Sequence, residues 1–319
     1  MRRRLMAAAI VAAAVLAGMG PSLAESDPRL DRLERDVARQ RGKVTFERAC
    51  AACHGTSAQG NGPGAADLNP HPRDLTTNAF RFRSTSSGAP PRPEDLERTI
   101  RRGLPGSAMP AFDGLLSGGE IVELVAFIDS LRAPTDEAPP TALGIPTIPP
   151  ATAESIHEGR SLYTLLECWR CHGMKGDGHG PSANGLVDDQ GRPIRTTDFR
   201  HDPLKGGREP ADLARSILTG LNGSPMPSYG DALVFAREDY PDPPTLDEQI
   251  PPDAAAEAVA YVRSAQTREA LESLGADGQT ALRDARLASL VHYVMSLDKR
   301  SGFWSTVFRE KPEFEPRYP

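Results

Sequence analysis

The segments "CAACH" at residues 50–54 and "CWRCH" at residues 168–172 contain all four cysteines of this 319-residue chain. Two cysteines separated by two residues can form a tight disulfide, half of a zinc site or a redox-active dithiol. The histidine that directly follows each pair favours a different kind of site, because C-x-x-C-H is a motif for covalent haem attachment. The sequence therefore favours two haem-attachment sites, with two disulfides or one zinc site built from all four thiolates as the alternatives.

Under this interpretation the protein binds two covalent haem c groups. The thiols form thioether bonds to the porphyrin vinyl groups, and the adjacent imidazole then reaches the iron. The thioether bonds are assigned to Cys50, Cys53, Cys168 and Cys171. The proximal iron ligands are assigned to His54 and His172.

The surroundings of the two motifs repeat as well, which indicates a tandem duplication. The stretch "ACAACHGTSAQGNGPGA" at 49–65 matches "ECWRCHGMKGDGHGPSA" at 167–183 in its cysteines, histidine and later G-x-G-P. Further on, "EDLERTIRRGLPGSAMPAF" at 94–112 and "ADLARSILTGLNGSPMPSY" at 211–229 are identical at ten of nineteen positions. Isolated motif matches would not preserve both the order and the spacing.

A methionine in each repeat is the candidate for the sixth iron ligand. Met109 follows His54 by 55 residues, and Met226 follows His172 by 54 residues. Each lies in a Gly- and Pro-containing loop, and the proline beside it cannot continue a helix. A thioether at this position closes the iron to substrates and raises its reduction potential. The sequence therefore predicts His/Met ligation in both repeats.

Four further residues are candidates for contacts around the haem. Pro63 and Pro181, in the "GNGP" and "GHGP" segments, are proposed to present a carbonyl to the proximal imidazole N–H. Arg73 and Arg195 lie in the long loops that follow, and pairing with haem propionates is the proposed role. A plain surface turn and solvated charges are the respective alternatives.

Composition and periodicity predict an all-α fold. The chain has 29 glycines and 30 prolines but few aromatic residues, which suits small helical domains with long loops better than a sheet. Apolar residues recur at helical spacing within 27–48 and 118–131, and shorter helices are expected at 94–102 and 210–218. The last helix of the second repeat is assigned to 287–297 in preference to 257–264.

The expected domain organisation follows from the repeat and from proline-rich runs. A linker at 133–152 contains a dense run of prolines and is expected to be extended and semi-rigid. It separates domain 1 (25–132) from domain 2 (153–319). Domain 2 has an insertion at about 232–280 and a tail, neither of which has a counterpart in domain 1.

Residues 1–24 have the features of a signal peptide: three arginines, a short apolar segment and "SLA" before the expected cleavage point after Ala24. An uncleaved anchor is the alternative. Cleavage removes three arginines and no acidic residue, so the formal charge of −6 becomes more negative. An acidic chain is a poor candidate for nucleic-acid binding, and the mature chain contains no expected transmembrane segment. We expect a periplasmic protein.

Taken together, the CxxCH, G-x-G-P and G-S-x-M-P motifs resemble those of class I c-type cytochromes. The resemblance covers nearly all of 40–131 and 155–230 and a terminal helix, and it extends to dihaem cytochromes that serve respiratory oxidoreductase complexes. It implies two tandem cytochrome c domains, each with one haem c. The insertion, the tail and a one-residue shift before Cys168 depart from the pattern and leave the redox partners open.

The leading functional prediction is an electron carrier that exchanges electrons with protein partners, either free or as a subunit of a larger oxidoreductase. The alternative is a dihaem enzyme, a peroxidase or an oxidoreductase of a small inorganic substrate, which needs an accessible iron. The apolar residues of the insertion and tail are expected to pack across the inter-domain seam or onto a partner, or else to thicken the domain 2 core. These residues are Ala258, Val259, Tyr261, Val262, Phe303, Trp304 and Phe308.

Overall fold

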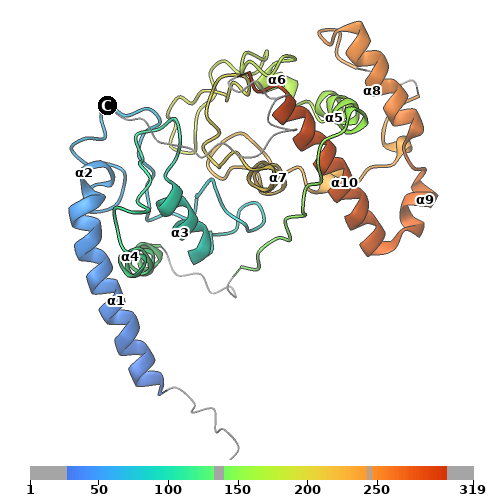
Figure 1. Cartoon of the computed structure of the whole chain (residues 1–319). Coiled ribbons are helices and arrows are strands. Elements are labelled where there is room, and N and C mark those ends of the chain that lie inside the picture. Colours follow the sequence, from blue (N-terminus) through green and yellow to red (C-terminus); the bar gives the residue numbers. More distant parts are fainter. Residues whose placement is uncertain (1–26, 133–139, 243, 245, 300–319) are drawn as a thin grey trace, which may run out of the picture.

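The computed structural model of the chain describes residues 27–132, 140–242, 244 and 246–299 (Figure 1). Within these residues it consists of helices and loops, without a β-sheet, which confirms the prediction of an all-α fold. None of the described helices is both long and apolar enough to cross a membrane. Two groups of helices, each with its own hydrophobic core, follow one another along the chain.

The first group, which we call the N-terminal unit, comprises residues 27–132. Asp27 caps its first helix by accepting a backbone hydrogen bond, and Pro28 occupies the first turn, where its missing N–H costs nothing. Ser117 and Glu120 form a reciprocal capping box at the start of its last helix. The helices are α1 (Pro28–Ala49), α2 (Ala51–His54), α3 (Pro93–Arg102) and α4 (Gly118–Leu131).

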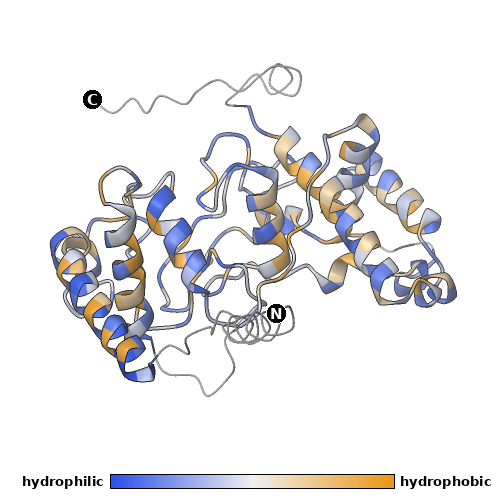
Figure 2. Cartoon of the chain, turned by 60° about the horizontal axis from the view of Figure 1, so that its bottom comes forward, coloured by the Kyte–Doolittle hydropathy of each residue, from blue (hydrophilic) through white to orange (hydrophobic). Residues whose placement is uncertain are grey.

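The second group, the C-terminal unit, comprises residues 153–299. Figure 2 shows hydrophobic stretches on the helices at both ends of the molecule, as two separate cores require. Four of its helices follow the order of the N-terminal unit: α5 (Ala153–Leu165), α6 (Trp169–His172), α7 (Pro210–Thr219) and α10 (Gly275–Ser296). Additional short elements lie between α7 and α10: η1 (Asp231–Leu233), η2 (Arg237–Asp239), α8 (Pro252–Ser264) and α9 (Arg268–Ser273).

In both units the first long helix crosses the last one at a glycine. A Cβ atom on Gly42 would lie 1.9 Å from the carbonyl oxygen of Glu123 in α4, and a Cβ atom on Gly159 would lie 1.9 Å from that of Ser289 in α10. Aromatic pairs flank the two crossings: Phe46 with Phe127 and Tyr163 with Tyr293. The assignment of 287–297 to the last helix of the second repeat is therefore confirmed.

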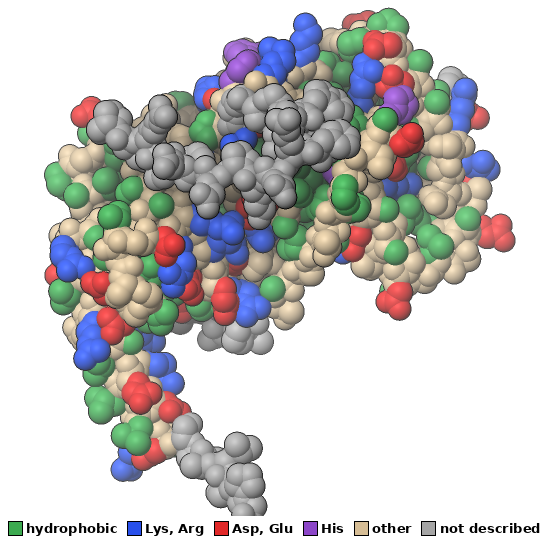
Figure 3. All heavy atoms as spheres, in the orientation of Figure 1, with side chains coloured by type: hydrophobic (Ala, Val, Ile, Leu, Met, Phe, Trp, Pro, Cys, Tyr) green, Lys and Arg blue, Asp and Glu red, His purple; other side chains and the backbone are tan. Residues whose placement is uncertain are grey.

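The first half of α1 extends beyond the rest of the N-terminal unit (Figure 1). Its apolar residues Leu30, Leu33 and Val37 are exposed, and charged side chains of both signs lie between them (Figure 3). Only the second half of the helix, from Gly42 onward, contributes buried residues.

The insertion does not cross the seam between the units, and this part of the prediction is wrong. Ala254, Ala258 and Val262 of α8 recur every four residues and are buried in the core of the C-terminal unit. The Tyr261 hydroxyl donates to Glu158 of α5 at 2.6 Å. The apolar face of α8 thus thickens the core of its own unit, the alternative considered above. Phe303, Trp304 and Phe308 of the tail lie outside the described residues.

The described part of the linker, 140–150, is extended and contacts both units. The backbone N–H of Leu143 donates to the carbonyl of Ser84 in the N-terminal unit at 2.7 Å. Ile145 and Ile148 pack against the core of the C-terminal unit. Proline-rich sequence of this kind is a semi-rigid spacer, and here its apolar side chains anchor it as well.

The two units are joined directly by a buried arginine. Arg83, in a loop of the N-terminal unit, has no exposed surface. Its guanidinium donates to the carbonyls of Thr219 at 2.6 Å and Gly220 at 3.2 Å, at the C-terminal end of α7, and also to that of Ser86. A cation at this end of a helix satisfies carbonyls that lack helical partners and complements the helix dipole. Arg83 therefore fixes α7 against the N-terminal unit.

Two polar contacts extend this junction on either side. The side-chain amide of Asn222 accepts from the N–H of Gly88 at 3.0 Å and donates to the carbonyl of Ala89 at 3.2 Å. The buried Asp212 carboxylate accepts hydrogen bonds from Arg102 of α3 and from Arg215 of α7. Asn222 lies in the loop that carries Met226, so the N-terminal unit contacts that loop through Asn222.

Candidate functional site

Each C-x-x-C-H motif forms a short helix, α2 or α6, and its histidine is held by a backbone carbonyl. Nδ1 of His54 lies 2.9 Å from the carbonyl oxygen of Arg73, and Nδ1 of His172 lies 3.1 Å from that of Thr197. A carbonyl can only accept, so Nδ1 carries the hydrogen and Nε2 keeps its lone pair. This is the tautomer in which Nε2 can bind a metal.

The proposed role of Pro63 and Pro181 in orienting the imidazole is wrong. Both prolines are exposed, and the orienting carbonyls come from segments 19 and 25 residues after the histidines. Each segment is held by a backbone hydrogen bond to the turn after the motif: Leu75 N–H to the Ala58 carbonyl and Phe199 N–H to the Gly176 carbonyl.

The glycines of the G-x-G-P segments pack against the haem motif. A Cβ atom on Gly62 would lie 2.4 Å from the carbonyl oxygen of Ala52, and one on Gly180 would lie 2.2 Å from that of Arg170. The N–H groups of the same glycines donate to the carbonyls of Cys53 and Cys171 at 3.1 Å. Only glycine allows so close an approach, which explains why the segment recurs in both repeats.

Burial keeps both imidazoles neutral. It lowers the pKa of His54, an effect that the hydrogen bond to Arg73 opposes and the nearby His71 reinforces. Burial likewise lowers the pKa of His172, against the hydrogen bond to Thr197. The ring of His172 also stacks on Phe199, with centroids 4.2 Å apart. Neutral, oriented imidazoles are what iron ligation requires.

The cysteines are free thiols, one pair in each unit. Burial raises the pKa of Cys50 to about 11 and that of Cys168 to about 12. Because the pairs belong to different units, they do not converge on one site. Within the described residues no cluster of three or more His, Cys, Asp and Glu side chains is arranged to hold a metal ion.

The two methionine loops have the same hydrogen bonds. The N–H of Leu104 donates to the carbonyl of Met109 at 3.0 Å, and that of Leu221 donates to the carbonyl of Met226 at 3.0 Å. In each loop a serine hydroxyl bonds the leucine carbonyl and accepts from the methionine N–H; these serines are Ser107 and Ser224. Each methionine therefore lies on a loop that is closed by hydrogen bonds between its own residues.

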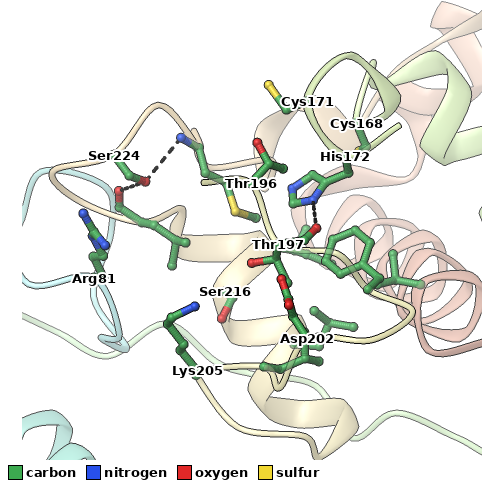
Figure 4. Close-up of a pocket in the computed structure, with 18 of the residues that line it drawn as sticks. Arg81, Cys168, Cys171, His172, Thr196, Thr197, Asp202, Lys205, Ser216 and Ser224 are labelled. Carbon is green, nitrogen blue, oxygen red and sulfur yellow. Dashed lines mark hydrogen bonds between the residues drawn. The ribbon is translucent and has the colours of Figure 1, made fainter. Parts of the chain in front are cut away.

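In the C-terminal unit the predicted residues surround one cavity of about 380 Å³. Cys168, Cys171 and His172 line it, and so does Met226 from the loop after α7 (Figure 4). Two thiols, a neutral imidazole and a thioether around one largely apolar space are the donors that a covalent haem needs, so the residues fit this group. In the N-terminal unit Cys50 and Met109 both pack against the hydrophobic core of that unit.

The two arginines proposed for propionate contacts have carboxylate partners in the structure. Arg73 donates to Asp189 of the C-terminal unit at 2.9 Å, and Arg195 donates to Asp202 at 2.8 Å. Arg195 also lines the cavity. Pairing of either residue with a propionate stays a prediction.

Several residues of the site had no signal in the sequence that we used. The hydroxyl of Tyr163 donates to the carbonyl of Gly173, directly after His172, at 2.7 Å. The carbonyls of Arg73 and Thr197 belong to loops of unequal length, so alignment of the repeats does not pair them. Arg81 and Phe82 line the cavity from the N-terminal unit, and they have no counterpart in the repeat alignment.

The comparisons with known proteins agree with this site. A protein-family model described as cytochrome C oxidase, cbb3-type, subunit III matches residues 37–128. Among solved structures, the chain is similar to a chain of the reducing HAO-like protein complex of Kuenenia stuttgartiensis. The identity is 31%, the TM-score is 0.62, and the match covers 81% of this chain and 96% of that chain. No curated protein matches.

A cytochrome c domain implies covalently bound haem c and a role in electron transfer. The family match includes the Cys50–His54 motif and the Met109 loop, and the solved relative extends the similarity over most of the sequence. The chain therefore belongs to the cytochrome c family, as a relative of a chain in an HAO-like protein complex.

Proposed function

We propose that the protein is a dihaem c-type cytochrome that carries electrons between protein partners. The observation that carries this proposal is the repetition of one arrangement in both units. Each has a C-x-x-C-H helix, a neutral histidine held through Nδ1 by a carbonyl, and a methionine on the same bonded loop. Haem c bound there would supply one-electron chemistry by cycling between ferrous and ferric iron.

The residues of the chain serve this function by holding the cofactor still and closing it to other chemistry. Backbone carbonyls fix the orientation of His54 and His172, which favours a constant ligand geometry in both oxidation states. Met109 and Met226, on closed loops, would occupy the position that a substrate needs. This arrangement favours a carrier over the alternative of a dihaem enzyme.

We further propose that the protein acts in the periplasm, within or beside an oxidoreductase complex. The signal-peptide pattern of residues 1–24 supports export, where c-type haem is attached. The similar solved chain belongs to a reducing HAO-like protein complex, which supports a complex-bound role for this chain too. Its own donor and acceptor would then be protein surfaces of that class of assembly.

The decisive experiment is a haem count on the protein matured by an export system competent for c-type haem. A pyridine haemochrome assay should give two haems per chain, and the mass should exceed that of the mature polypeptide by two haem groups. Cys168→Ala/Cys171→Ala should leave one, and so should Cys50→Ala/Cys53→Ala. A chain that carries zinc, or that gains no mass, would contradict the proposal.

A further inference from the structure

The cavity of the C-terminal unit has a second, cationic end that the haem motif does not explain. Arg195 and Lys205 line it from the C-terminal unit, and Arg81 enters it from the N-terminal unit (Figure 4). The ribbon that carries Arg81 thus belongs to a different unit from the one that carries His172 and Met226. A site with walls from two units is complete only when both are in place.

The three cations are close enough to repel one another. Burial lowers the pKa of Lys205; Asp202 opposes this effect, and Arg195 and Arg81 add to it. Burial also lowers the pKa of Arg81, and the neighbouring Arg73 lowers it further. Cations are gathered in a partly buried site at a cost in free energy, which an anion in the same site would offset.

The carboxylates around this end are outnumbered by the cations. Asp188 lies 3.6 Å from Arg81, too far for a hydrogen bond, and opposes the lowering of its pKa together with Asp189. Asp189 bonds Arg73, and Asp202 bonds Arg195. Within the described part of the chain, the buried Nε of Arg81 finds no hydrogen-bond acceptor. Around this end Arg73, Arg81, Arg195 and Lys205 thus face Asp188, Asp189 and Asp202, and Arg81 keeps an unused buried donor. The other carboxylate that lines the cavity, Glu167, accepts a hydrogen bond from Arg170.

The geometry points to a composite site: Arg81 of the N-terminal unit and Lys205 of the C-terminal unit together receive the carboxylates of the haem attached at Cys168 and Cys171. This inference rests on the proposed dihaem function and goes beyond it, because it makes one unit part of the cofactor site of the other. Its consequence is that the N-terminal unit sets the reduction potential of the C-terminal haem.

The position of Arg81 is secured by its neighbours in sequence. Arg83, two residues later, is fully buried and donates to the end of α7, the helix just before the Met226 loop. Phe82 lies against Gly206, beside Lys205: a Cβ atom on this glycine would be 2.9 Å from the Phe82 ring. Arg81 is therefore held at the cavity by a segment that is itself fixed to both units.

The test is a redox titration of the full-length holoprotein, followed by visible spectroscopy. The potential that falls in Met226→His identifies the C-terminal haem. A nearby cation favours the ferrous form, which carries one positive charge fewer, so Arg81→Gln should lower that potential. We expect a change of about tenfold in the oxidation equilibrium, which corresponds to about 59 mV for one electron. The potential of the N-terminal haem should change less.

Four further variants make the result specific. Arg81→Lys keeps the charge and should restore most of the potential. Arg101→Gln removes a half-buried arginine of the same unit that does not line the cavity, and it should leave the potential unchanged. Asp188→Asn keeps its loop hydrogen bonds to Gln190 and Arg192 but removes a negative charge, so it should raise the potential. Lys205→Gln should act like Arg81→Gln. Asp188→Asn and Lys205→Gln test the inference even if Arg81→Gln does not fold.

Counting haems in every variant separates the two proposals. A chain without a haem at Cys168 and Cys171 would refute the proposed function itself. Two haems per chain, with a C-terminal potential that neither Arg81→Gln nor Lys205→Gln changes, would overturn the composite site. A larger shift at the N-terminal haem than at the C-terminal one would overturn it as well.

Discussion

At the scale of single residues, Gly42 and Gly159 have the same role in helix packing. Each lets the first helix of its unit touch the backbone of the last helix, and an added methyl group would overlap a carbonyl oxygen. The two glycines also lie at nearly the same distance before the C-x-x-C-H motif, eight residues before Cys50 and nine residues before Cys168. Their role in packing follows only from the folded chain, in which Gly42 contacts α4 and Gly159 contacts α10.

We predict that Gly159→Ala destabilises the protein because α5 and α10 must separate to admit the methyl group. The expected loss is about 1–3 kcal/mol in the free energy of unfolding, measured by chemical denaturation. Gly119→Ala is the matched control, since this helical glycine has open space around its Cβ position. Equal effects of the two substitutions would contradict the role assigned to the crossing.

A second prediction at this scale concerns the two methionines proposed as axial ligands. Met226→His and Met109→His should each lower the potential of one haem, because imidazole favours ferric iron more than a thioether does. Each should also abolish half of the long-wavelength charge-transfer absorption of ferric Fe–S(Met). Met174→His, beside the motif but outside the methionine loop, should leave both potentials in place. If a loop substitution changes neither potential, that methionine is not a ligand.

At the scale of elements, the N-terminus of α4 joins the last helix of the N-terminal unit to the first. Glu120 accepts from the backbone N–H and the hydroxyl of Ser117 and from the Arg48 guanidinium of α1. The hydrogen bond from the Ser117 N–H is the largest cause, and the three hydrogen bonds together lower the pKa of Glu120 to about 2. A carboxylate with a lowered pKa adds stability at neutral pH that is lost in acid.

The predicted pH dependence follows from the lowered pKa of Glu120. The contribution of Glu120 should be complete above its ordinary pKa of about 4.5 and disappear as the pH falls toward 2. Unfolding of the wild type and of Glu120→Gln, measured between pH 2 and 7, should differ most at neutral pH and converge in acid. Glu47→Gln, on the exposed face of α1, is the control that should show no such convergence.

The helices α1, α3, α4 and α7 were predictable from the sequence to within a residue or two, because apolar periodicity and caps such as Ser117 are local signals. The start of α10 was not, since this helix begins at Gly275, twelve residues before the predicted 287. The chemical groups around the C-terminal cavity were predictable for the same reason: the repeat marks Cys168, His172 and Met226. The carbonyl of Thr197 was not, since every residue has a carbonyl and only the path of a long loop selects one. The docking of α8 on α5 depends on shape in the same way.

At the scale of the whole molecule, the junction between the units rests on Arg83. Burial lowers the pKa of Arg83 to about 10, against the influence of Asp95, so the side chain keeps its charge at neutral pH. Its sequence context gave no sign of this role, because the carbonyls of Thr219 and Gly220 that it bonds lie more than 130 residues away. Burial and partners of this kind appear only in the folded chain.

We predict that Arg83→Met weakens the junction. The carbonyls of Ser86, Thr219 and Gly220 would lose their donor, at a cost of about 1–3 kcal/mol for each one that stays buried. If water reaches them instead, the units separate and thermal unfolding should split into two transitions. Arg92→Met, which removes a half-buried arginine of the same unit that, among the described residues, does not contact the C-terminal unit through a hydrogen bond or ion pair, should preserve the wild-type profile. An unchanged melting curve for Arg83→Met would contradict this account.

The linker segment 140–150, held by Leu143 on one side and by Ile145 and Ile148 on the other, also bears on kinetics. The two haems proposed above would lie on a single chain with a bonded junction, so they would not need to find each other by diffusion. Electron exchange between them would be a first-order event, independent of protein concentration, because the tether acts as a fixed effective molarity. Solvent viscosity should therefore slow the delivery of electrons by a partner while leaving the internal step unchanged.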